Sequence, residues 1–200
     1  MSARSPKLVP LRRVAGEVSE LSDEALLAAC ATGDAAALGA LFDRFNVAVY
    51  RFAARLATTD ELARDDLVQA TFLEVPRIAG KFGGRSSVKT WILGVAANIA
   101  RHQLRSEQRR RAHQARFLDR NEDAAAAPED QVDRKRMLAR IGDALAELPH
   151  DLQVAFVLCD LEQLPGAEVA RVLEIPEGTL WRRLHQARKQ VRAAVEEQAP

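Results

Sequence analysis

The sequence predicts an all-α protein of two small helical domains joined by a flexible acidic linker, the C-terminal domain being a helix-turn-helix. Composition is the first reason, because aromatic residues make up only 5% of the 200 residues and helix formers dominate. Periodicity is the second, because apolar residues recur every three or four positions. Charge is the third: residues 101–116 hold six arginines and one glutamate, whereas residues 119–133 hold six acids and one arginine. This reversal of sign predicts a break between two domains.

The domain boundaries follow from that break. Residues 119–133 have almost nothing apolar to bury, so their ordering entropy is expected to keep them flexible. We therefore predict four segments: a disordered N-terminal tail (1–21), a first helical domain (22–108), a flexible charged linker (109–136) and a helix-turn-helix domain (137–196).

Two helices are expected to open the first domain. Ser22 precedes two acids and can cap the first helix, and Gly33 and Asp34 end that helix and start another. From Leu38 to Leu56 apolar residues, including Phe42, keep helical spacing over five turns. This ridge is predicted to be core.

The third predicted helix lies in DELARDDLVQATFLEVPRIAGKF, residues 60–82. Its periodicity turns Leu67 and Val75 inward and leaves Asp66 and Gln69 on a polar face, with Phe72 at the boundary. A polar face that holds one large aromatic indicates a protein partner. Periodicity alone favours the simpler interpretation, in which Phe72 completes the core.

A glycine- and serine-containing loop and a cationic helix follow, in KFGGRSSVKTWILGVAANIARHQLR. Val95 and Ile99 lie on the apolar side of the helix. Cations lie on or beside the other side, close to aromatics; this set is Lys89, Arg101, His102 and Arg105 with Asn98, Trp91 and Phe82. Cations beside aromatics and a flexible loop are what a protein needs to hold unstacked bases of single-stranded DNA. A place for Trp91 in the core is an equal alternative.

Residues 166–192 predict two short helices around a tight break. Leu180, Leu184, Ala187 and Val191 share one face of the second helix, which turns the opposite face outward. Residues 177–192 hold five Lys or Arg and one acid, Glu177, a surface that suits a phosphate backbone. The pattern is that of a helix-turn-helix that reads DNA. A solvated basic helix at the end of a helical bundle is the alternative.

Composition and motifs exclude other classes of protein. The sequence has no phosphate-binding loop, nucleophile elbow or paired metal ligands, so we expect neither an enzyme nor a metal or other cofactor. Cys30 and Cys159 lie in apolar runs, where buried reduced thiols are expected. No apolar run approaches the roughly 20 residues that cross a bilayer and no secretory signal is present, which predicts a cytoplasmic protein without a membrane partner.

At these residues the chain resembles bacterial sigma-70 factors of the extracytoplasmic-function (ECF) group. DDLVQATFLEV resembles the helix by which this family docks on the β′ coiled coil of RNA polymerase, at Asp66, Leu67, Gln69 and Phe72. The segment from Lys81 to Arg105 resembles the element that recognises and opens the minus-ten promoter region. ELPHDLQVAFVLCDLEQLPGAEVARVLEIPEGTLWRRLHQAR resembles the module that places its last helix in the major groove of the minus-thirty-five element.

The resemblance implies a sigma factor that binds core RNA polymerase, through the β′ coiled coil and the β flap, and directs promoter recognition, DNA melting and initiation. The partners it implies are promoter DNA, double- and single-stranded, and an anti-sigma factor. It assigns the minus-ten strand to Phe82, Arg85, Ser86, Ser87, Lys89, Trp91, Asn98, Arg101 and Arg105. It assigns the minus-thirty-five duplex to Gly178, Thr179, Trp181, Arg182, Arg183, His185, Gln186 and Lys189. The alternatives are a stand-alone dimeric helix-turn-helix regulator and a protein that sequesters a transcription component without binding DNA.

Departures from the family pattern carry their own expectations. Pro76 stands where the family usually has Trp and is expected to end or kink the docking helix at Val75. Pro165 and Gly166 replace the usual hydroxyl cap of the first helix of the helix-turn-helix. Glu174 stands where a glycine often makes the turn, at a cost of roughly 1–2 kcal/mol if the left-handed geometry is kept.

Overall fold

The structure, a computed structural model, describes residues 20–56, 61–114 and 141–197. Its elements in chain order are α1 (Asp23–Ala31), α2 (Ala35–Arg55), α3 (Glu61–Ile78), the 3-10 turn η2 (Ala79–Lys81), α4 (Val88–Gln114), α6 (His150–Phe156), the π-helical turn η3 (Val157–Leu161), α7 (Gly166–Val172) and α8 (Glu177–Glu197). Residues 141–147 are also helical. No strand occurs in these ranges, which confirms the all-α prediction.

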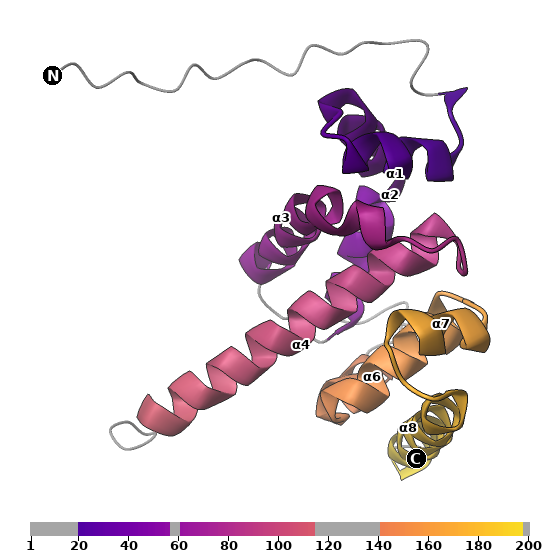
Figure 1. Cartoon of the computed structure of the whole chain (residues 1–200). Coiled ribbons are helices and arrows are strands. Elements are labelled where there is room, and N and C mark those ends of the chain that lie inside the picture. The colour runs from indigo at the N-terminus through magenta and orange to yellow at the C-terminus, as the bar shows by residue number, and fades with distance from the viewer. Residues whose placement is uncertain (1–19, 57–60, 115–140, 198–200) are drawn as a thin grey trace, which may run out of the picture.

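The first four helices form one bundle, drawn from indigo to pink in Figure 1. The Oγ atom of Ser22 accepts a hydrogen bond from the amide of Ala25 at 3.2 Å and so caps α1. Asp34 caps α2 through a bond of 2.8 Å from the amide of Ala36, and Gly33 makes the turn between them with a φ of +91°. The predicted start of α1 and the predicted break before α2 are therefore confirmed.

The core of this bundle lies between α2 and the first half of α4. Leu41, Val49 and Phe52 are fully buried, as are Ile92 and Leu93 on α4. The prediction that the apolar ridge of α2 is core is correct for these residues.

Phe42 is the exception on that ridge, because 41% of it is exposed. Its ring packs edge-on against Phe72 of α3, with ring centroids 4.9 Å apart. The reason is geometric: Phe42 lies at the flank of the apolar stripe, where it covers Phe72 without being covered itself.

Helix α3 continues through Pro76 to Ile78, so the expected end at Val75 is wrong. Proline removes one backbone donor, which would have bonded to the carbonyl of Phe72. Because Pro76 stands in the last turn, the helix loses only that one interaction and the preceding turns remain intact. The surface of α3 before Phe72 is therefore continuous.

The C-terminal half contains the predicted helix-turn-helix, with α7 and α8 as its two helices. Leu180, Leu184 and Ala187 are buried and Val191 is 8% exposed, as the spacing predicts. Pro176 precedes α8 and its carbonyl accepts from the amides of Thr179 and Leu180 at 2.9 and 3.1 Å. The residues that close the far end of this half form a second small cluster: Leu145, Leu148, Leu152, Ala187 and Val191.

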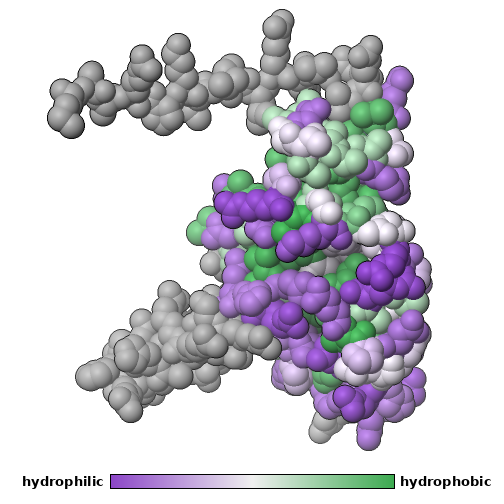
Figure 2. Space-filling model, viewed as in Figure 1, coloured by the Kyte–Doolittle hydropathy of each residue, from purple (hydrophilic) through white to green (hydrophobic). Residues whose placement is uncertain are grey.

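The two halves pack against one another in this structure. Buried residues of α2 and α4 and buried residues of α6, η3 and α7 form one continuous apolar cluster. Helix α7 lies against the first half of α4 (Figure 1). Figure 2 shows that hydrophilic residues cover much of the lower part of this face, over α4 and the C-terminal helices, while hydrophobic patches lie higher up.

Helix α4 is longer than predicted. It extends to Gln114, so residues 109–114, which the sequence analysis placed in the linker, are helical. The rest of the predicted linker, up to residue 136, and the predicted tail up to residue 19 lie outside the described residues. Within the described ranges, none of the helices combines the length and apolar character needed to span a bilayer.

Candidate polymerase and nucleic-acid interfaces

One exposed stripe runs along α3, and we call Leu62, Asp66, Gln69 and Leu73 the docking stripe. Their spacings of four, three and four residues place them on one face of the helix. Asp66 and Gln69 are exposed, and the two leucines at the ends of the stripe are 73% and 61% exposed. A polar centre between two exposed leucines on one helix face is suited to a protein partner.

Leu67 and Phe72 do not belong to this surface. Leu67 is 3% exposed and Phe72 is 5% exposed, because both point into the bundle. The sequence prediction of direct polymerase contacts by these two residues is therefore corrected: they hold α3 in place. Leu62 and Leu73, which sequence reasoning missed, are the exposed apolar residues on the face of Asp66 and Gln69, and their spacing from these two residues was the signal that could have found them.

The loop before α4 is shaped by its own hydrogen bonds. The Oγ atom of Ser87 accepts from the amide of Thr90 at 3.1 Å and so caps α4. Gly84 has a φ of +65°, a conformation that glycine adopts at little cost. Phe82 packs edge-on against Trp91 with ring centroids 5.7 Å apart, which anchors the start of the loop to the helix.

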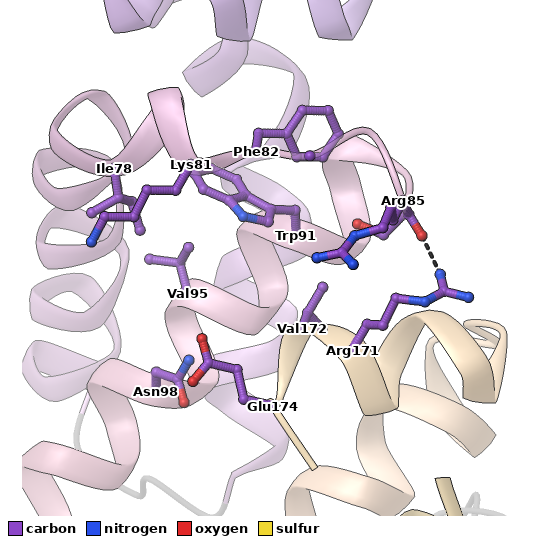
Figure 3. A pocket seen from close by; sticks show the side chains of 12 residues that line it. Ile78, Lys81, Phe82, Arg85, Trp91, Val95, Asn98, Arg171, Val172 and Glu174 are labelled. Carbon is purple, nitrogen blue, oxygen red and sulfur yellow. Dashed lines mark hydrogen bonds between the residues drawn. The ribbon is translucent and has the colours of Figure 1, made fainter. Parts of the chain in front are cut away.

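A pocket of about 280 Å³ lies beside this loop (Figure 3). The predicted minus-ten residues that line it are Phe82, Arg85, Ser86, Trp91 and Asn98. Trp91 is half-buried and faces the pocket, whereas the adjacent Ile92 is fully buried in the core. Ile92 is therefore core, whereas Trp91 packs against the core cluster and also forms part of the pocket wall. Lys81, which the sequence analysis did not single out, also lines the pocket.

The other predicted minus-ten residues do not line this pocket. Arg101 donates to the Oδ1 atom of Asn98 at 2.9 Å, and Arg105 follows one turn later on α4. Ser87 and Lys89 make bonds to the C-terminal half: the amide of Ser87 donates to Glu168 at 3.0 Å, and the Lys89 ammonium donates to Glu162 at 3.0 Å. The structure therefore brings Phe82, Arg85, Ser86, Trp91 and Asn98 together at the pocket, with Arg101 beside Asn98, whereas Ser87 and Lys89 face the C-terminal half.

Helix α8 presents the predicted reading face to solvent. Six of its assigned residues are exposed: Gly178, Trp181, Arg182, His185, Gln186 and Lys189. Thr179 is half-buried. Arg183 is turned back toward α6, where its guanidinium bonds to the carboxylate of Asp151 at 2.6 Å. Arg183 thus holds α8 against α6 as well as bordering the reading face.

Trp181 is only half exposed because its ring covers the start of α7. A Cβ atom added to Gly166 would lie 2.7 Å from Cζ2 of Trp181, closer than real Cβ contacts. Only a glycine leaves room for the ring. Gly166 thus leaves space for the Trp181 indole, although Pro165 leaves α7 without a side-chain cap.

Gly166→Ala is expected to displace the Trp181 ring from its seat. The tryptophan emission maximum should then move to longer wavelength, because more of the indole faces water, and affinity for minus-thirty-five duplex should fall by a few fold. Gly39→Ala is the control, since a Cβ there meets nothing within 4 Å. An unchanged emission spectrum for Gly166→Ala would show that the ring is not held at this position.

Glu174 makes the turn after α7 in the left-handed geometry, with a φ of +56°. The left-handed geometry is thus retained in this chain, and it costs roughly 1–2 kcal/mol for a residue with a Cβ atom. Glu174 also lines the pocket beside the loop, opposite Asn98 (Figure 3). A strained residue thus contributes a carboxylate to the pocket wall.

The two cysteines are free thiols, Cys30 buried and Cys159 half-buried. Burial, followed by the charge of Asp34, raises the pKa of Cys30 from 9.0 to about 11. Burial, followed by the charge of Asp160 and opposed by Arg188, raises the pKa of Cys159 to about 11. Protonated, unreactive thiols fit the predicted structural role.

Both thiols are expected to react with iodoacetamide much more slowly in the folded protein than in urea at about pH 8, because the thiolate is the nucleophile. Since folding raises both pKa values, the stabilisation that they contribute is complete below about pH 9 and is lost as the pH rises toward about 11. Mass spectrometry of each labelled cysteine measures the rates. Equal rates in folded and unfolded protein would contradict the assignment.

Family models match both halves of the chain. The model described as Sigma-70 region 2 matches residues 41–110, and the one described as Sigma-70, region 4 matches residues 138–191. The ECF RNA polymerase sigma factor SigC of Mycobacterium tuberculosis is 32% identical over 178 residues, which cover 86% of this chain and 90% of SigC. The ECF RNA polymerase sigma-E factor of Haemophilus influenzae is 27% identical and covers 86% of this chain and 94% of its own length.

Solved structures share the fold. The structure of CnrH in complex with the cytosolic domain of CnrY has a TM-score of 0.62 at 23% identity and covers 88% of this chain and 99% of its own chain. The sigma factor RpoE of Bartonella quintana, in complex with the anti-sigma factor NepR, has a TM-score of 0.62 at 20% identity and covers 79% of this chain and 96% of its own. The chain belongs to the ECF group of the sigma-70 family, RNA polymerase-binding factors that direct transcription to promoters.

Proposed function

We propose that the docking stripe of α3 binds the β′ coiled coil of core RNA polymerase. The support is the arrangement of the stripe: two exposed leucines with Asp66 and Gln69 between them on one uninterrupted helix face. Leucines supply apolar area to the contact, and the polar pair supplies hydrogen bonds that set its register. Phe42 and Phe72 support this face from below, because their edge-on contact ties α3 to α2.

The pocket beside the loop is proposed to hold an unstacked base of the minus-ten strand. A volume of about 280 Å³ accommodates a nucleobase, and Phe82 and Trp91 offer aromatic surfaces next to it. Stacking on aromatic side chains contributes about 1–3 kcal/mol per base, which offsets the few kcal/mol lost when a base leaves the duplex. Asn98 supplies hydrogen-bonding groups, and Arg85, Arg101 and Arg105 supply positive charge for the backbone of that strand.

The exposed face of α8 is proposed to enter the major groove of the minus-thirty-five element. Arg182 can pair with the edge of a guanine, while Trp181 offers apolar contact and one donor. Thr179 and Gly178 stand in the first turn of a helix of 21 residues, where backbone amides can meet a phosphate. The C-terminal half is further proposed to contact the β flap.

Held by polymerase, the two halves would contact two promoter elements at once. Two weak contacts then combine into one tighter engagement, because the second forms at high effective concentration. We further propose that a protein antagonist binds this chain, since the solved relatives CnrH and RpoE are complexed with CnrY and with the anti-sigma factor NepR. A factor that serves polymerase on the chromosome is proposed to act in the cytoplasm.

The observation that carries these assignments is the co-location, on one chain, of an exposed docking stripe, a base-sized pocket beside a basic helix and an exposed reading helix. The test is run-off transcription from genomic fragments with purified core polymerase and the full chain. We expect defined start sites only when both are present. Retardation of duplex by the chain alone, with two-fold symmetric footprints and no added transcripts, would instead support a dimeric regulator.

A further inference from the structure

Trp181 is an exposed apolar side chain on an otherwise polar helix face. It is the fifth residue of α8 and is 50% exposed. The other exposed residues assigned to this face are a glycine and polar or charged side chains: Gly178, Arg182, His185, Gln186 and Lys189. In helix-turn-helix proteins, the N-terminal residues of the second helix reach the base edges in the major groove. Trp181 therefore lies in the part of α8 that is proposed to enter the groove.

The indole ring of Trp181 is held in place by α7. A Cβ atom added to Gly166, the first residue of α7, would lie 2.7 Å from Cζ2 and 3.0 Å from Cη2 of the ring. The ring therefore packs directly on backbone, and this contact restricts its rotation. Gly178, one turn before Trp181 on α8, has no side chain that could cover the ring. A side chain whose orientation is already restricted loses little conformational freedom when it binds.

The chemistry of the major groove determines what such a ring can recognise. The apolar group among the base edges there is the C5-methyl of thymine, whereas the groups that identify the other bases are hydrogen-bond donors and acceptors. The single donor of the indole, Nε1–H, discriminates poorly, because guanine, adenine and thymine all present acceptors. Arg182 and Lys189 already supply donors on this face. What Trp181 adds to the face is apolar surface.

Resting on the function proposed for α8, we propose that Trp181 recognises the C5-methyl group of a pyrimidine in the minus-thirty-five element and that Gly166 is its positioning residue. The base read in this way is thymine. 5-Methylcytosine carries the same methyl group at the same place in the groove, so a cytosine at this position would be bound more tightly once methylated. Arg182 reads a different base pair through hydrogen bonds, which makes the two contributions to promoter choice separable.

The test removes the methyl group from the DNA and leaves the protein unchanged. Preferred duplex elements are selected with core polymerase that carries the full chain, and each thymine of the minus-thirty-five element is then replaced in turn by uracil. Uracil keeps the hydrogen-bonding groups of thymine, so a contact through Nε1–H would bind both bases equally. We expect uracil at one position to lower the affinity about three- to fivefold, the effect of losing one buried methyl group. Competition binding measures each affinity.

Three protein variants link this loss to the ring. Trp181→Ala should bind the thymine and uracil elements equally, and it should not distinguish cytosine from 5-methylcytosine at that position. Gly166→Ala should also lose the discrimination, because its Cβ displaces the ring, whereas Gly39→Ala, where a Cβ meets nothing within 4 Å, should keep it. A merely structural role of Gly166 would lower the affinity for both elements alike and leave their ratio unchanged. Circular dichroism verifies that each variant keeps its helices.

Two outcomes would overturn methyl recognition by Trp181: a native chain for which uracil is as good as thymine at every position, or a Trp181→Ala chain that keeps the native discrimination. A native thymine-to-uracil ratio in Gly166→Ala would overturn the positioning role of Gly166. If Arg182→Ala still changes the preferred element while the uracil series has no effect, methyl recognition alone is rejected. If polymerase that carries the native chain shows no sequence preference in the upstream element, the function proposed for α8 is rejected.

Discussion

Replacing Leu73 with glutamate is expected to lower the affinity for core RNA polymerase at least about 100-fold while leaving the fold intact. The side chain is 61% exposed in the free protein, so the charge is tolerated there. In the complex, the substitution removes about 1.5–3 kcal/mol of apolar burial and adds the cost of desolvating a carboxylate. A total near 3 kcal/mol corresponds to roughly a hundredfold change in affinity.

The matched control is Val47→Glu on α2. Val47 is 55% exposed, and it lies five residues after Phe42, which places it about 140° around the helix from the ring that supports α3. This control should bind polymerase as the native chain does. Asp66→Ala and Gln69→Ala should each weaken binding by a few fold through lost polar contacts. Competition binding with labelled core polymerase measures all four, and a Leu73→Glu chain that binds as tightly as Val47→Glu would remove the stripe from the interface.

Arg182→Ala is expected to change which minus-thirty-five sequence is preferred. A bidentate contact between Arg and guanine contributes about 1–3 kcal/mol of discrimination, so the preferred element should lose roughly 5- to 150-fold in affinity and one base pair should become degenerate. The side chain is exposed, so folding should be unaffected. Selection of preferred sequences from a randomised duplex library by polymerase carrying each variant measures this change.

Lys189→Ala is the comparison for Arg182→Ala. If Lys189 contacts a phosphate, its loss should weaken binding to all sequences alike. The number of counterions released on binding should also fall by about one. Arg183→Ala should also weaken binding to all sequences and, because Arg183 is bonded to Asp151, should lower the melting temperature as well. A shifted base preference for Lys189→Ala, with none for Arg182→Ala, would mean that the helix is rotated relative to our assignment.

The helices, most of their caps and the reading face could be predicted because they depend on local chemistry. A serine or aspartate before an apolar run caps a helix through bonds to amides two or three residues away, as Ser22 and Asp34 do. Helical spacing likewise determines which residues of α8 share a face, and Leu180, Leu184 and Ala187 are buried together. The family motifs along the chain likewise consist of residues close in sequence, so they indicated the family without any knowledge of tertiary contacts.

Which residues of α3 are exposed depends on contacts with other helices, and the spacing of apolar residues along α3 does not describe those contacts. Leu67 and Leu73 are both leucines of one helix, yet Leu67 is 3% exposed and Leu73 is 61% exposed, because they lie on different faces of α3. Phe72 is buried because Phe42 covers it from another helix. Pro76 was expected to end α3, but the packing of α3 into the bundle outweighs one lost hydrogen bond in the last turn.

By itself, then, the sequence determined most of the helical segments and the family, because each follows from short-range spacing and residue chemistry. Only the tertiary structure decided that Gly166 makes room for Trp181 and that Glu162 and Glu168 accept hydrogen bonds from Lys89 and Ser87. The bonds of Glu162 to Lys89 and of Glu168 to Ser87 join residues 73 and 81 positions apart. Contacts at such separations depend on how whole helices pack, and a local pattern carries no record of that packing.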